Sequence, residues 1–169
     1  MNKFNFILLP LVFLLGSGYS VFAQNTVAEK EMAKIEKLAR GADVIVTGKV
    51  TERKSNWNEN KTRIYTRATL RVDEYIKGDR NGDVVEVTYP GGEVGEVGEI
   101  YSHMPRFEEN EEVLVFLKKD KQLKGFKVFD GEEGKISVVR DIKSNEKISR
   151  SSNSVRELKR QINKYLEQE

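Results

Sequence analysis

The chain contains no cysteine, and this absence excludes several kinds of chemistry at once. No disulfide staples the fold, no thiolate acts as a nucleophile or zinc ligand, and no lipid is attached through a cysteine. The single histidine, His103, cannot complete a catalytic triad or a zinc site without suitable partners. We therefore expect a non-catalytic protein that carries no metal and no other cofactor.

Neither sign of charge is in excess. The chain has 29 Lys and Arg against 27 Asp and Glu, for a net charge of +2. A nearly neutral chain is not expected to be a dedicated polyanion binder, which leaves room only for local basic patches. No apolar run after residue 23 is long enough to cross a bilayer. We expect neither a nucleic-acid partner nor a stable membrane anchor.

The N-terminus has the three parts of a secretory signal. Lys3 supplies positive charge, residues 6–15 are apolar apart from one proline, and residues 21–23 end in small-x-small fashion at Ala23. This pattern predicts cleavage after Ala23 and a secreted or periplasmic protein. Removing 23 of the 169 residues leaves 146, the size of one ordinary domain.

Helical patterns flank the rest of the chain. Thr26 and Glu29 have the spacing of a capping box, and apolar residues then recur at helical spacing over residues 27–40. A second capping box, at Ser154 and Glu157, precedes another apolar stripe. The predicted organisation is a signal peptide (1–23), an N-terminal amphipathic helix (24–41), a β-barrel (42–140), a linker (141–153) and a C-terminal amphipathic helix (154–169).

Between the helices the pattern is that of short strands. Alternating or continuously apolar runs predict strands at 43–52, 62–76, 83–89, 113–117, 125–129 and 135–139. Residues 55–60 are expected to form a hairpin turn, and residues 90–111 a long loop. The sequence therefore predicts a mainly β protein, a small antiparallel barrel of five to six strands.

Two segments carry a resemblance to a known family. Residues 42–50 (ADVIVTGKV) and 75–79 (YIKGD), followed by a valine-rich strand and residues 111–117, resemble the netrin-like inhibitory domain of the tissue inhibitors of metalloproteinases. The same run, with Pro90-Gly91-Gly92 and Phe107, resembles bacterial secreted modules whose function is not established. The resemblance implies an OB-like barrel. It does not imply the inhibitors' mechanism, which uses an N-terminal cysteine to chelate zinc, because this chain would mature at Gln24 and has no cysteine.

The first function hypothesis is a non-catalytic exported binding module. It would engage a protein partner, such as a protease, through loops at the rim of the barrel, because loops as long as 90–111 are often functional. The candidate residues are Trp57, Gly91, Gly92, Glu93, His103 and Phe107. Trp57 either contacts the partner at a hairpin tip or folds back over the barrel end, and His103 alternatively is a solvated loop residue.

The alternative is a binder of an anionic glycan or of the cell envelope. Strand alternation places Arg63, Tyr65, Arg67 and Arg71 on one face, and Lys49 joins them if the first two strands pair. The same alternation is expected of any half-buried strand, in which case Asp73, Glu74 and Glu52 would neutralise these cations.

Seven glutamates lie in or beside the long loop, at positions 93, 96, 99, 108, 109, 111 and 112. Such a cluster raises the possibility of a calcium site or of a hydrolase with paired carboxylates. The Asp/Asn/Gly spacing of a calcium loop is missing, and no spacing singles out a catalytic pair. A solvated acidic loop is the simpler interpretation.

Overall fold

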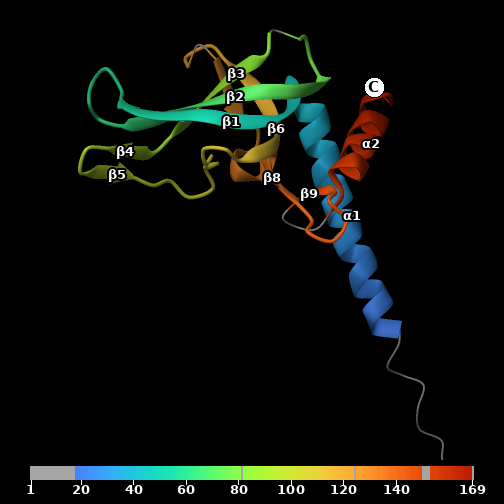
Figure 1. Cartoon of the computed structure of the whole chain (residues 1–169). Coiled ribbons are helices and arrows are strands. Elements are labelled where there is room, and N and C mark those ends of the chain that lie inside the picture. Colours follow the sequence, from blue (N-terminus) through green and yellow to red (C-terminus); the bar gives the residue numbers. More distant parts are fainter. Residues whose placement is uncertain (1–17, 81, 124, 150–152, 169) are drawn as a thin grey trace, which may run out of the picture. The chain divides into compact units, whose positions relative to one another are not determined.

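The structure is a computed structural model that describes residues 18–80, 82–123, 125–149 and 153–168 (Figure 1). The first 17 residues of the predicted signal peptide lie outside this description, so that prediction stays untested. The elements are α1 (Gly18–Gly41), β1 (Val44–Trp57), β2 (Ile64–Lys77), β3 (Val84–Pro90), β4 (Gly92–Val94), β5 (Val97–Glu99), β6 (Glu112–Asp120), β7 (Gly125–Val128), the 3-10 helix η1 (Gly131–Gly134), β8 (Lys135–Arg140), β9 (Lys147–Ser149) and α2 (Val155–Leu166).

The chain divides into two compact units, one ending at Lys34 and one running from Ile35 to Glu169. The described part of the first unit is the beginning of α1, where the side chains of Val27 and Met32 are exposed. The second unit holds all the strands and α2.

The strands confirm a mainly β protein and form a ring. The main sheet has the order β1-β2-β3-β7-β6-β8-β9, and β1 also pairs with β6. Strands β1, β2, β3, β7 and β6 therefore close on themselves, and β8 and β9 extend the sheet from β6. The expectation of an entirely antiparallel sheet is wrong at one seam, because β3 and β7 run parallel and pair only at Val87 and Phe126.

The first hairpin is longer than the sequence indicated. Residues 55–57, predicted as part of a turn, continue β1, and Trp57 pairs with Ile64 of β2. The turn proper begins at Asn58, whose side-chain oxygen accepts hydrogen bonds from the main-chain nitrogens of Thr62 (2.8 Å) and Arg63 (3.1 Å). A polar composition hid this strand end because few of its residues are buried.

Two segments predicted as irregular contain strands. Residues 92–99 of the long loop fold into the β4–β5 hairpin around Gly95, which has a left-handed φ of 62°. Residues 147–149 of the predicted linker form β9, which pairs with β8. These strands are three residues each, too short for alternation to be detected.

The sheet is apolar on both sides of β6, as its continuous apolar run predicted. Val113, Val115 and Leu117 face the inside of the ring, where they join side chains from β1, β2, β3 and β7. Leu114 and Phe116 face outwards and join a second cluster with the helices. All five side chains are at most 1 % exposed, so β6 is the strand shared by both cores.

The helices cover the outer face of β1 and β6. Leu38 near the end of α1 and Leu158 and Ile162 of α2 pack with Ile45 and Phe116. Because this cluster is continuous, α2 stabilises the ring from outside.

Both predicted helix boundaries need correction. The predicted start at residue 24 is wrong, since α1 begins at Gly18 and continues through Thr26, the predicted cap position. Residues 19–26 contain no proline or glycine that would interrupt it. At α2 the Ser154 side chain makes no capping bond, and Glu157 instead binds Arg160. This helix ends at Leu166, the last apolar residue that packs on the core.

Candidate functional site

One candidate site is a cleft of about 500 Å³ at the end of the β1–β2 hairpin, which we call the rim cleft. One wall is the inward face of the hairpin, the second is the β4–β5 hairpin, and the third is the segment from Ile100 to Glu108. Figure 1 shows β4 and β5 lying alongside the distal half of β1 and β2. The residues used below are Arg53, Ser55, Thr66, Tyr89, Gly91, Gly92, Glu93, Glu99, Ile100, Tyr101, Arg106 and Glu108.

Gly91 and Gly92, two residues of the predicted site, allow the β4–β5 hairpin to lie close to β1 and β2. The Thr66 hydroxyl donates a hydrogen bond to the Gly91 carbonyl (2.6 Å) and is 2.8 Å from the Ser55 hydroxyl. Gly92 has a φ of 129°, and a Cβ there would lie 2.2 Å from Thr66 Oγ1 and 2.4 Å from Ser55 Oγ. Only glycine fits this close approach, so Pro90-Gly91-Gly92 shapes the cleft wall.

Glu99 ties the outer strand of that hairpin to β2. Its Oε2 atom accepts hydrogen bonds from the Ile64 main-chain nitrogen (3.0 Å) and from the Tyr101 hydroxyl (3.0 Å). The hydrogen bond to Glu99 raises the pKa of Tyr101 above its ordinary value. The Glu99 carboxylate therefore holds the β4–β5 wall of the cleft in place.

Tyr89 and several charged side chains line the cleft. Tyr89 packs against Phe107 with ring centroids 5.6 Å apart, and burial raises the Tyr89 pKa. A guanidinium nitrogen of Arg53 lies 3.6 Å from a Glu108 carboxylate oxygen. Within the described residues, the side chains of Arg106 and Glu93 form no ion pair, so both charges are available to a ligand.

The structure brings together only part of the predicted rim set. Gly91, Gly92 and Glu93 line the cleft, whereas Trp57 and His103 do not. Trp57 is half-buried at the end of β1. It is therefore neither a fully exposed hairpin-tip contact nor a side chain fully folded over the barrel end.

His103 and Phe107 have other surroundings. The His103 side chain is 86 % exposed, and its Nδ1 atom lies 3.6 Å from a carboxylate oxygen of Glu132. Phe107 is fully buried in the core of the ring, so it offers a partner no surface.

Sequence reasoning missed the polar residues of the cleft. Arg53 and Ser55 point inward because a register shift between Val50 and Glu52 inverts the alternation of β1, which the sequence does not reveal. Glu99 and Tyr101 belonged to a loop with no periodicity, so their hydrogen bonds left no signal in the sequence.

The predicted basic face forms on the outer side of the β1–β2 ribbon. Lys49 lies directly opposite Arg71, and Lys54, which was not predicted, lies opposite Arg67. Tyr65 lies opposite Asn56, and Arg63 precedes β2.

Only one of the three carboxylates expected to neutralise this face contacts one of its cations. Glu52 contacts Lys54 (2.5 Å), Asp73 is 3.9 Å from Lys147, and Glu74 binds Lys159. None of the three forms an ion pair with the arginines of β2; Arg67 is instead 3.7 Å from Glu86.

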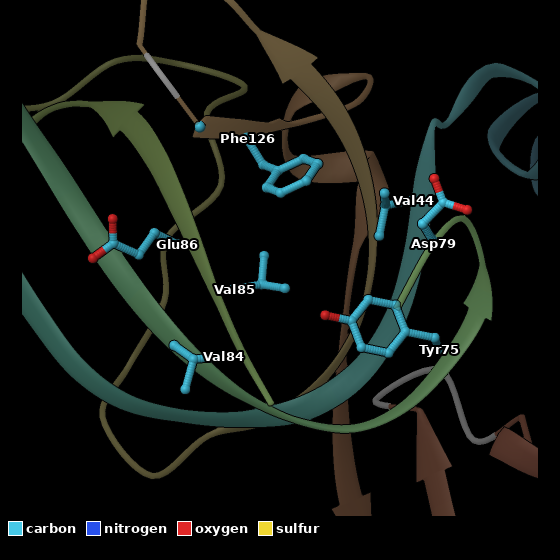
Figure 2. A pocket seen from close by; sticks show the side chains of 8 residues that line it. Val44, Tyr75, Asp79, Val84, Val85, Glu86 and Phe126 are labelled. Carbon is cyan, nitrogen blue, oxygen red and sulfur yellow. The ribbon is translucent and has the colours of Figure 1, made fainter. Parts of the chain in front are cut away.

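Another hollow, of about 230 Å³, lies at the parallel seam between β3 and β7. Figure 2 shows Val44, Val85 and Phe126 turned toward one another, while the Glu86 carboxylate points away. The Tyr75 hydroxyl donates to the Gly82 carbonyl (3.0 Å). This hollow is smaller than the rim cleft, and its Tyr75 hydroxyl is used within the fold.

Over the described ranges, no group of three or more Asp, Glu or His side chains is placed to hold a metal ion. Among the described residues, no helix is long and apolar enough to cross a membrane. No protein-family model matches the chain, and no curated protein matches it.

Proposed function

We propose that the chain is an exported, non-catalytic binding module that engages a protein partner through the rim cleft. The observation that carries this proposal is the combination of a roughly 500 Å³ cleft with an exposed apolar anchor at its edge. Ile100, which lines the cleft, is 77 % exposed, so its apolar side chain is accessible to a partner. Arg106 and Glu93 add charges of both signs around it, as at the polar rim of a protein interface.

The architecture supports this use. We interpret the ring of β1, β2, β3, β7 and β6 as an OB-like barrel, with β8 and β9 as an extension. A closed ring with a filled interior holds the loops at its end in fixed positions, so a partner binds a preformed surface. The resemblance of residues 42–50 and 75–79 suggests a protease as the class of partner.

The polar groups of the cleft favour binding over catalysis. The hydroxyls of Ser55 and Thr66 bond to each other and to the Gly91 carbonyl, and the Glu99 carboxylate is held by two donors. A hydroxyl used in this way has no adjacent base to activate it as a nucleophile.

Quantitative capture from the native extracellular or periplasmic fraction tests the proposal. Ile100→Asp places a charge in the expected contact, and Ile142→Asp is a matched control because Ile142 is 100 % exposed but does not line the cleft. We expect the wild type and Ile142→Asp to capture the same partner and Ile100→Asp to lose it. Identical capture by all three proteins would contradict the proposal.

A further inference from the structure

Two pairs of cations face each other in register on the outer side of the ribbon. Lys49 of β1 is the cross-strand partner of Arg71 of β2, and Lys54 is the partner of Arg67. Arg63 lies just before β2 on the same hairpin. We call these five residues the cationic stripe.

This arrangement opposes the stability of the fold. Like charges directly opposite on neighbouring strands are destabilising, whereas opposite charges there are stabilising. The chain is nearly neutral overall and has 27 Asp and Glu residues. An excess of basic residues therefore does not explain two opposed cation pairs in one ribbon.

The neighbouring carboxylates compensate this charge only partly. Glu52 binds Lys54, and Glu86 approaches Arg67 at 3.7 Å, both on exposed side chains where ion pairs contribute little. Arg63 and Arg71 have no carboxylate within 4 Å in the described part of the chain. The next strand contributes Glu112, opposite Lys49, but this carboxylate is 2.7 Å from Lys147.

The stripe is open to solvent and extended. Lys54, Arg67 and Arg71 are exposed, and Lys49 is partly exposed. Arg67 and Arg71 are four residues apart on one strand, which places the two cation pairs roughly 13 Å apart along the ribbon. Such a row matches a chain molecule that repeats its negative charge better than a single small anion.

We propose that the cationic stripe binds a linear acidic polysaccharide, whose carboxylate or sulfate groups lie between the opposed cations. A bound polyanion relieves the repulsion of both pairs at once. Binding of single-stranded nucleic acid would call for successive aromatic side chains on which bases stack, and Tyr65 is the one aromatic residue among those placed on this face. This proposal uses none of the rim-cleft residues and stands independently of the proposed function.

The test measures binding of a fluorescent heparin oligosaccharide by anisotropy at several salt concentrations. The variant K49Q/R71Q removes one opposed pair, and K121Q/K143Q is the matched control, since it removes two exposed lysines outside the stripe. We expect K49Q/R71Q to bind about tenfold more weakly at low salt with a shallower salt dependence, and the control to bind like the wild type. The melting temperature of K49Q/R71Q should equal or exceed that of the wild type, which excludes misfolding as the cause.

Three results would overturn this inference. One is K49Q/R71Q binding within twofold of the wild type, which includes the case in which neither binds. Another is an equal loss in K121Q/K143Q, which would show that net charge alone governs the interaction. The third is an oligothymidylate of matched charge that binds as tightly as the oligosaccharide and depends equally on Lys49 and Arg71, which would assign the stripe to nucleic acid.

Discussion

The ammonium of Lys135 lies 2.8 Å from the Glu111 carboxylate, and both side chains are only 10 % exposed. The same ammonium donates to the Arg106 carbonyl and sits 5.1 Å from the centroid of the Phe107 ring. Through these contacts the pair joins the end of the rim-cleft segment to β8. The cleft is therefore held at one end by hydrogen bonds to Glu99 and at the other by this ion pair.

Removing one partner of the pair should destabilise the protein. We expect Lys135→Met to lower the free energy of unfolding by about 3 kcal/mol, because it leaves the Glu111 carboxylate partly buried without its cation. Urea denaturation at neutral pH measures this loss. Lys127→Met is a control, since Lys127 is half exposed in its pair with Asp120, and a change above about 1 kcal/mol there would show that exposure does not govern the effect.

The pair also predicts how stability depends on pH. Burial raises the pKa of Glu111, but hydrogen bonds from Lys135, Ser137 and the Glu108 main chain outweigh it, so the pKa lies below the ordinary value of 4.5. A lowered pKa in the folded state means that the stabilisation is complete above pH 4.5 and is lost as the pH falls through the folded-state pKa.

Urea midpoints measured between pH 7 and pH 3 should fall below pH 4.5, and Glu111→Gln should flatten that fall. Lowered pKa values at Asp43 and Glu112, each chiefly through a lysine hydrogen bond, will leave some dependence in the variant. An unchanged acid slope in Glu111→Gln would mean that Glu111 does not contribute.

Gly92→Ala should disturb the cleft more than a substitution at another left-handed glycine. A methyl group at Gly92 meets the hydroxyls of Thr66 and Ser55, whereas one at Gly95 meets nothing within 4 Å. Both substitutions strain the backbone by about 1–3 kcal/mol, and the clash adds to this only at Gly92. Unfolding free energies and amide exchange in β5 measure the difference; equal effects would contradict the placement of the hairpin against Thr66.

Leu158→Ala tests whether α2 stabilises its own ring. Leu158 is 4 % exposed and packs in the cluster of Ile45 and Phe116. We expect a loss of about 2–4 kcal/mol, as for other buried leucines, and less than about 0.5 kcal/mol for Arg156→Ala on the exposed side of the same helix. If both variants were as stable as the wild type, the packing of α2 on the sheet would be wrong.

The sequence predicted local structure well where one face of a strand is buried. Ile64, Ala68 and Leu70 alternate with exposed arginines, and the continuous apolar run in β6 indicated burial on both sides. The closure of the ring could not be predicted this way. It depends on pairings between distant segments, such as Val87 with Phe126, for which periodicity carries no information.

The candidate site was likewise predictable where it depends on local sequence and unpredictable where it depends on long-range pairing. Gly91 and Gly92 were found because a glycine pair after a strand indicates a special backbone turn. Phe107 was assigned to the rim because its segment looked like a loop, although its side chain fills the ring. The opposition of Lys54 and Arg67 depends on a register shift between Val50 and Glu52, which the sequence does not reveal.

Site-specific photo-crosslinking tests the central claim, that the rim cleft receives a protein partner. The chain is prepared with p-benzoylphenylalanine in place of Glu93, at the cleft, or in place of Lys143, away from it, and is irradiated in the native extracellular or periplasmic fraction. We predict one dominant adduct of defined mass from position 93, lost when Ile100→Asp is added, and no such adduct from position 143. The same adducts from both positions, or none from position 93, would contradict the account.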